Sequence, residues 1–261
     1  MKIAILYICT GPYSIFWNQF YQSSERRLLI HHEKTYFVFT DDDSINEKSN
    51  IKIFKKLAQG FPLDSLLRFE LFNSIKEHLE EFDFIYFFNS NMYIKDEIAE
   101  EIFPGSQNNG LVGVLHPGYY SKKVFWYPFE KRKKSKAFTK YNEQLKYYMG
   151  SFNGGTSSAY LKLISNCQKN IEDDYTRDII AIYHDESHLN CYLNSKHPLM
   201  LSPAFAFPEN SNLPFPNRIT ILDKVMHGGQ YFDKLPKKAY IKRARKKFNI
   251  FIHSLVWKFF R

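Results

Sequence analysis

The sequence is poor in cysteine, with three residues of this type at Cys9, Cys167 and Cys191. An odd number at these long spacings argues against a disulfide framework, and no short cysteine pair suggests a zinc or redox site. The sequence also lacks a long apolar run near its start. The apolar part of MKIAILYICTGPY covers only about eight residues, too few for a signal-peptide core or a membrane span. We therefore expect a buried first strand in a cytoplasmic protein.

Two phosphate-binding loops of nucleotide enzymes are missing. Neither G-x-G-x-x-G nor G-x-x-x-x-G-K-[ST] occurs in the chain, which argues against ordinary dinucleotide-dependent dehydrogenases and P-loop kinases. The H-E-x-x-H zinc pattern is absent as well. Any chemistry must therefore come from polar clusters elsewhere in the chain.

Positive charge and aromatic rings are abundant, with a net charge of +9 and 18% Phe, Trp and Tyr. Much of the basic excess lies in residues 236–261, where Lys and Arg precede apolar positions recurring at intervals of three and four. That pattern predicts a basic amphipathic tail that docks on an anionic membrane surface, and it also fits a C-terminal helix packed on the domain. Basic charge suits nucleotides and nucleic acids too.

Apolar β-rich runs alternate with helical segments over residues 1–235. We expect strands at 2–9, 34–40 and 51–57, then strands ending at Asn89 and His116, and helices at 16–29 and 63–82. This order predicts one α/β domain whose mainly parallel central sheet is flanked by helices. Ligands in such sheets bind beyond the carboxyl ends of the strands.

The segment HDESHLN at 184–190 places His184, Asp185 and Glu186 side by side at the predicted start of a helix. Neighbouring helical residues point about 100° apart, so the two carboxylates should have different roles. Acidic residues also favour the first turn of any helix, which is the alternative explanation.

The segment Asn89-Ser90-Asn91 follows a hydrophobic strand, where a pair of acids would be able to hold a divalent ion. Neutral amides are poor ligands for Mg²⁺ or Mn²⁺, and a plain turn is the alternative. Two further segments, at 116–120 and 147–155, combine Gly with aromatic residues. They fit either sugar-binding surfaces or turns and bulges.

Together these segments resemble glycosyltransferase family 6, over roughly residues 2 to 230. The resemblance rests on YICTGPY at 7–13, YFVFTD at 36–41, Arg68, NSN at 89–91, HPGYY at 116–120, FEKR at 129–132, YYMGSFNGG at 147–155, HDESHLN at 184–190 and LSP at 201–203. It implies a GT-A type fold and α-1,3 transfer of galactose or N-acetylgalactosamine from a UDP-sugar, with retention. The implied acceptor is a galactoside, such as Fucα1,2Gal, in a surface polysaccharide or lipopolysaccharide.

By the same resemblance, Glu186 is the acid beside the anomeric carbon. The donor is assigned to Tyr7, Ile8, Tyr13, Arg68, Asn89, Asn91, Met149, Gly150, Ser151, His184, Asp185 and Lys224, and the acceptor to His116, Trp126, Glu130 and Glu186. Asn89 and Asn91 depart from the Asp-x-Asp of mammalian members. We therefore expect no metal cofactor and expect Lys224 to supply the positive charge that stabilises the leaving diphosphate. A Mn²⁺ cofactor is the alternative.

Two other hypotheses remain open from the residues. A nucleic-acid-binding protein would use the basic tail but has no need of the HPGYY and HDESHLN segments. An inactive carbohydrate-binding relative is less consistent with the intact Glu186.

Overall fold

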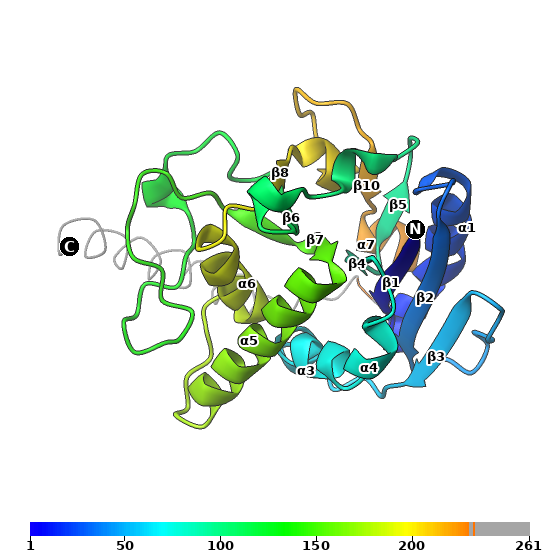
Figure 1. The fold of residues 1–261 in the computed structure, drawn as a ribbon, viewed down its shortest axis with the longest axis horizontal. Coiled ribbons are helices and arrows are strands. Elements are labelled where there is room, and N and C mark those ends of the chain that lie inside the picture. Colours follow the sequence, from blue (N-terminus) through cyan, green and yellow to red (C-terminus); the bar gives the residue numbers. More distant parts are fainter. Residues whose placement is uncertain (230–231, 233–261) are drawn as a thin grey trace.

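A seven-stranded sheet in the order β3-β2-β1-β4-β7-β6-β8 lies at the centre of the computed structural model, which describes residues 1–229 and 232 (Figure 1). Its strands are β1 (Lys2–Ile8), β2 (Glu33–Thr40), β3 (Ile51–Lys55), β4 (Phe84–Asn89), β6 (Leu111–Leu115), β7 (Tyr148–Thr156) and β8 (Leu199–Leu201). The first four strands in this order are parallel, β7 is antiparallel to both of its neighbours, and β8 is parallel to β6. The predicted α/β architecture with a mainly parallel sheet is confirmed.

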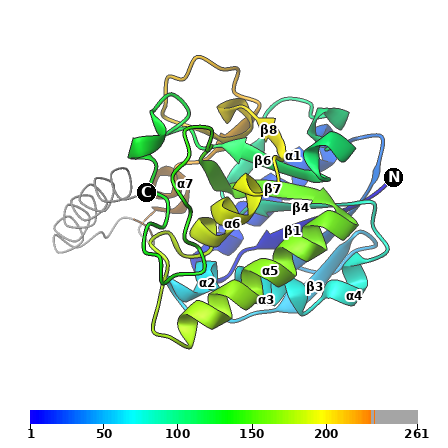
Figure 2. The same cartoon turned by 60° about the vertical axis from the view of Figure 1, so that its left-hand side comes forward.

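Both faces of the sheet are covered because alternate side chains of its buried strands point to opposite sides. Ile3, Ile5 and Tyr7 of β1 join α1 (Trp17–Arg27) and a small second sheet of β5 (Met92–Ile94), β10 (Ile219–Ile221) and β9 (Phe207–Pro208). Ala4 and Leu6 face the other side, with α3 (Arg68–Asn73), α5 (Ser157–Tyr175) and α6 (His184–Asn194). Figure 2 shows these three helices together on one side of the sheet.

The helix predicted over residues 63–82 is wrong as a continuous element. It consists of α2 (Leu63–Leu66), α3 and α4 (Lys76–Leu79), because the backbone leaves helical geometry at Leu67 (φ −93°, ψ 9°) and at Ile75 (φ −114°, ψ 18°). Next to the second break, the Ser74 hydroxyl donates to the carbonyl of Leu71. Such local side-chain bonds compete with the helical pattern. The break at Leu67 starts a new helix at Arg68, whose side chain is buried.

The glycine-rich run 147–155 lies mostly in β7 and is not a turn. The register of β7 against β6 shifts between the pairs Gly113–Asn153 and Leu115–Tyr148, which is consistent with the alternative of a bulge. A Cβ at Gly154 would lie 2.4 Å from the carbonyl oxygen of Ile85, and one at Gly155 would lie 2.2 Å from that of Gly110. Both glycines are needed because β7 packs tightly between β4 and β6. The remaining predicted elements differ from the observed ones by one or two residues at their ends.

No helix within the described residues combines the length and apolar character that a bilayer crossing needs. The basic tail predicted at 236–261 lies outside the described residues.

Candidate active site

A cleft of about 300 Å³ opens beyond the carboxyl ends of β1 and β4. It is lined by Ile8, Thr10, Tyr13, Phe61, Asp64, Ser65, Arg68, Phe87, Asn89, Ser90, Met149, Gly150, Ser151, Tyr183, His184, Asp185, Glu186 and Lys224. Sequence reasoning placed a ligand at this edge of the sheet. The structure brings together there eleven of the residues assigned to the donor or the reacting carbon.

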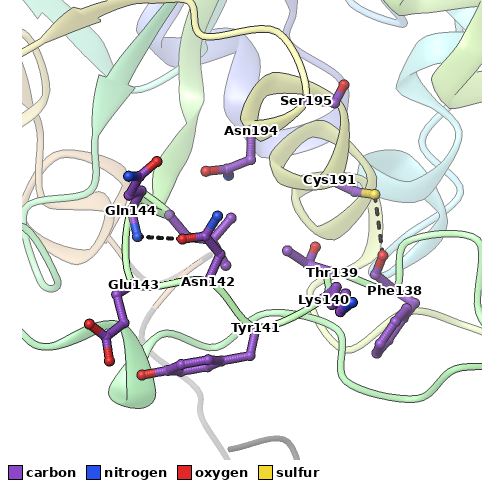
Figure 3. A pocket seen from close by; sticks show the side chains of 11 residues that line it. Phe138, Thr139, Lys140, Tyr141, Asn142, Glu143, Gln144, Cys191, Asn194 and Ser195 are labelled. Atoms are coloured by element: carbon purple, nitrogen blue, oxygen red, sulfur yellow. Dashed lines mark hydrogen bonds between the residues drawn. The ribbon is translucent and has the colours of Figure 1, made fainter. Parts of the chain in front are cut away.

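A larger hollow of about 870 Å³ lies between the loop 138–145 and the C-terminal end of α6 (Figure 3). Its ionisable side chains Lys140 and Glu143 are exposed. Burial raises the pKa of the Cys191 thiol at its edge, so that the thiol is protonated at neutral pH. The smaller cleft is the better candidate for catalysis because it holds buried charged groups.

The most buried charges of the cleft are Arg68, the first residue of α3, and Asp185 in the first turn of α6. Arg68 Nε lies 3.0 Å from Asp185 Oδ2, and Arg68 Nη1 donates to the carbonyl of Gly150 at 2.8 Å. Burial raises the pKa of Asp185 to about 6, although Arg68 acts in the opposite direction. Arg68 Nη2 and the hydroxyl of Ser151 have no hydrogen-bond partner among the described residues. Buried polar groups without a partner call for one, such as a water molecule or a ligand.

Glu186 differs from its neighbour Asp185 in both direction and surroundings. Its Oε1 accepts a hydrogen bond from the Tyr147 hydroxyl at 2.7 Å, and its Oε2 accepts one from the backbone N–H of Gly150 at 2.7 Å. Both oxygens are thus held while the side chain still lines the cleft. This geometry is consistent with the different roles expected for the two carboxylates. An oriented carboxylate can act as a nucleophile or stabilise positive charge.

Lys224, the first residue of α7 (Lys224–Gly228), brings a second basic side chain to the lining of the cleft. Its Nζ lies 3.1 Å from the hydroxyl and 4.7 Å from the ring centroid of Tyr13. The Asp223 side chain caps the helix by accepting from the N–H groups of Val225 and Met226. An amine held in this way can neutralise a phosphate group in the cleft.

Asn89 lines the cleft, whereas Asn91 is buried and faces the segment before α7. The Asn91 side chain donates to the carbonyl of Leu222 at 2.8 Å, and the Leu222 N–H donates to the Asn91 carbonyl at 2.8 Å. Among the described residues, His, Cys, Asp and Glu side chains form no group of three or more that could hold a metal ion. The two hydrogen bonds between Asn91 and Leu222 therefore anchor the segment that leads into α7 and Lys224, and we call this pair of bonds the clasp.

Comparison with known proteins identifies the family. The sequence profile of glycosyltransferase family 6 matches residues 1–228. The chain belongs to glycosyltransferase family 6. The α/β architecture described above is consistent with the GT-A type fold expected for this family.

Relatives of known function include bacterial and mammalian enzymes. The O-antigen biosynthesis glycosyltransferase WbnI of Escherichia coli is 36% identical over 226 residues, which cover 86% of this chain and 95% of WbnI. The histo-blood group ABO system transferase 2 of Rattus norvegicus is 27% identical over 79% of this chain and 64% of its own length. The globoside alpha-1,3-N-acetylgalactosaminyltransferase 1 of Mus musculus is 25% identical over 82% and 63%, respectively. The chain thus spans less than two thirds of these two mammalian relatives.

Besides Asn91, four residues assigned from the family resemblance do not line the cleft. Tyr7 is buried behind it, where its hydroxyl donates to the Ser90 carbonyl at 2.7 Å. Among those assigned to the acceptor, His116 packs against the ring of Tyr147, and Trp126 is 51% exposed.

Glu130, also assigned to the acceptor, is 2% exposed and accepts from Arg132 at 2.6 Å and from the N–H of Ile182 at 3.0 Å. These contacts fasten the chain just before α6, so Glu130 has a structural role in this conformation.

Several cleft residues were not assigned from the sequence, notably Phe61, Asp64 and Tyr183, and neither was Tyr147, which binds Glu186. The Phe61 ring meets His184 edge-on, with centroids 4.9 Å apart. Tyr147 belongs to the noted run 147–155, but its contact with Glu186 spans 39 residues of sequence. Local pattern gives no signal for such a contact.

The raised pKa of Asp185 leads to a pH prediction for this glycosyltransferase. Because that pKa is about 6 rather than 3.8, the folded protein binds a proton at Asp185 as the pH falls through 6. The protonated side chain no longer balances Arg68 or accepts as strongly from a donor hydroxyl. We therefore expect kcat/KM for the sugar donor to decline below about pH 6. Asp185→Asn should have a low rate without this acidic limb, and an unchanged limb in that variant would assign it to another group.

Proposed function

We propose that this protein is a retaining hexosyltransferase that moves galactose from UDP-galactose, in α-1,3 linkage, to a galactoside acceptor. UDP-N-acetylgalactosamine is the alternative donor, and Fucα1,2Gal in a surface polysaccharide or lipopolysaccharide is the proposed acceptor. The O-antigen role named for WbnI and the transferase activities named for the mammalian relatives support this class of reaction. The proposal depends on one observation. Glu186 lines the cleft, and each oxygen of its carboxylate accepts a hydrogen bond.

In the proposed reaction, the bond between the anomeric carbon and the UDP oxygen breaks as positive charge develops on the sugar ring. The Glu186 carboxylate stabilises that charge, or attacks the carbon and is later displaced from it. The acceptor oxygen then bonds to the anomeric carbon on the original face, and its hydroxyl proton passes to the diphosphate of the departing UDP. We assign the donor oxygens to Arg68 Nη2 and the Ser151 hydroxyl, which have no partner among the described residues, together with Asp185 and His184, which line the same cleft. Ile8 and Tyr13 would contact the uridine end of the donor.

The decisive test is Glu186→Gln, which keeps the shape of the side chain but removes its charge. We expect kcat for UDP-galactose to fall by orders of magnitude, on the order of 100-fold or more, while UDP still binds. Product analysis by NMR with Fucα1,2Gal and lactose acceptors checks the α-1,3 linkage.

Glu172→Gln is a matched control, because Glu172 is exposed on α5. Wild-type turnover in Glu186→Gln would contradict the proposal. A wild-type protein that binds UDP-sugars and galactosides without transfer would instead be an inactive carbohydrate-binding relative.

Ser151 sets the expected donor preference. Its side chain lines the cleft beside Gly150 and Met149, and it adds bulk that a 2-acetamido group would have to avoid. We expect a higher kcat/KM with UDP-galactose than with UDP-N-acetylgalactosamine, by a factor of about 10 to 100, since pocket size differences contribute roughly 1–3 kcal/mol. Ser151→Gly should shift the ratio toward the larger donor in a competition assay. A wild-type preference for UDP-N-acetylgalactosamine would refute the assignment.

We further propose that the reaction needs no metal cofactor and that Lys224 neutralises the leaving diphosphate. The Asn91 amide donates to the Leu222 carbonyl, and a carboxylate at that position would be unable to make this bond. Amide oxygens are also weak ligands for hard cations unless acidic groups accompany them. The amine of Lys224 in the cleft is the alternative source of positive charge.

Turnover should therefore survive saturating EDTA, whereas Lys224→Ala should cost about 2–4 kcal/mol of transition-state stabilisation. The measurement is kcat with and without EDTA, followed by addition of Mn²⁺. Lys169→Ala, which removes an exposed lysine on α5, is the control. Loss of activity in EDTA that Mn²⁺ restores would contradict the proposal that turnover needs no metal cofactor.

The proposed partners and place in the cell follow from a lipid-linked acceptor. Its sugar would be presented at the inner face of the cytoplasmic membrane, and the basic residues of 236–261 would attract the enzyme to anionic headgroups. No described feature of the cleft favours a nucleic acid as partner.

A further inference from the structure

Three side chains of α6 bind the same stretch of backbone at the start of β7. Glu186, Asn190 and Asn194 follow each other at intervals of four along the helix, so they lie on one face. Their partners are Gly150, Tyr148 and Lys146, which follow each other at intervals of two along the strand and the residues before it. We name this set of contacts the amide ladder.

Each asparagine of the ladder makes a pair of hydrogen bonds to one residue. Asn190 Oδ1 accepts from the N–H of Tyr148 at 2.7 Å, and its Nδ2 donates to the carbonyl of Tyr148 at 2.8 Å. Asn194 repeats the pattern on Lys146, with both distances at 2.9 Å. The second Nδ2 hydrogen of each asparagine is within reach of the helix carbonyl four residues earlier, that of Glu186 for Asn190 and that of Asn190 for Asn194. Only a carboxamide offers this combination of acceptor and two donors.

The spacing of the ladder follows from the geometry of the two elements. Four residues of an α-helix rise roughly 6 Å, and two residues of a strand advance about 6.6 Å, so the two repeats stay nearly in step over three contacts. In this segment, Asn190 and Asn194 of α6 bind the backbone groups of Tyr148 and Lys146 that a neighbouring strand would otherwise bind. Pairing of β4 with β7 ends at Phe88 and Phe152, before the segment that the ladder holds.

The contact at Glu186 differs from the other two because a carboxylate has no hydrogen to donate. Glu186 Oε2 accepts from the N–H of Gly150, while the carbonyl of Gly150 accepts from Arg68 at 2.8 Å and from Asn153 at 3.1 Å instead. The ladder therefore ends in a carboxylate at the cleft. At its other end, Asn194 lines the open hollow of Figure 3.

We propose that Asn190 and Asn194 are positioning residues that set the register of α6 against β7 and thereby place the Glu186 carboxylate. The same segment carries Tyr147, whose hydroxyl donates to Glu186, so a shift of the helix along the strand would disturb both contacts of the carboxylate. A misplacement of about 1 Å is enough to slow catalysis by about 100-fold. This inference rests on the catalytic role proposed for Glu186.

The test uses Asn190→Asp and Asn194→Asp in the full chain. Each variant keeps the acceptor oxygen but loses both donors, and it faces the strand carbonyl with a second acceptor. The readouts are the dissociation constant for UDP, the thermal unfolding midpoint, and kcat for acceptor-free hydrolysis of UDP-galactose. We expect kcat of Asn190→Asp to fall about 10- to 100-fold with UDP affinity nearly unchanged.

Asn194→Asp serves as a second variant where Asn190→Asp does not fold, because Asn194 is only half-buried and water can replace its bonds. Its kcat should fall less than that of Asn190→Asp but remain below the wild-type value. Asn170→Asp is the matched control, since the only side-chain hydrogen bond of Asn170 among the described residues is to the Asn166 side chain on α5.

The Glu186→Gln background separates positioning from general loss of structure. If Asn190 acts through Glu186, adding Asn190→Asp to Glu186→Gln should change the residual rate by less than about threefold, because coupled residues are not additive. Equal losses in both backgrounds, a parallel loss of UDP affinity, or wild-type kcat in both asparagine variants would overturn the proposal. A normal kcat in Glu186→Gln would instead refute the proposed role of Glu186, and the positioning role with it.

Discussion

The buried guanidinium of Arg68 joins the elements from which the cleft is built. It lies between the rings of Phe69 and Phe87, with its central carbon 4.9 Å and 4.7 Å from their centroids. From there it reaches Gly150 in β7 and Asp185 in α6. An ion pair this deeply buried adds little net stability over an apolar substitute, but removing one partner typically costs about 3–5 kcal/mol. Its value to the protein is therefore specificity of arrangement, since α3, β4, β7 and α6 all meet at one side chain.

Much of the fold was accessible from local pattern because its strands are long apolar runs between turn residues. β1, β2 and β4 are buried on both faces, and such strands are recognisable without knowledge of their neighbours. The segment 63–82 shows the limit of this reasoning. Its apolar periodicity is helical throughout, but the backbone leaves helical geometry at Leu67 and Ile75. β7 shows the opposite limit, since its glycines predict a turn until the close approach of two neighbouring strands is known.

The candidate site divides along a similar line. Arg68, Asp185, Glu186 and Lys224 were assigned through a family resemblance, and all four line one cleft. Tyr147 and the asparagines of α6 escaped assignment because their importance lies in contacts with residues about 40 positions away. Of the residues assigned to the acceptor, Glu186 lines the cleft, whereas His116, Trp126 and Glu130 lie outside it and Glu130 is paired with Arg132. The donor and acceptor roles of these residues stay predictions of the family resemblance.

The clasp between Asn91 and Leu222 constrains how a site of this type can evolve. One of its two hydrogen bonds requires a donor in the side chain at residue 91, because the carbonyl of Leu222 is the acceptor, whereas the other joins the two backbones. A mutation to aspartate would set two acceptors against each other and loosen the segment that leads into α7. Residue 91 and the segment before Lys224 are therefore epistatic. A lineage that exchanges the amide for an acid at this turn loses the side-chain bond and keeps the backbone bond, so the exchange costs least where another anchor for that segment is already in place.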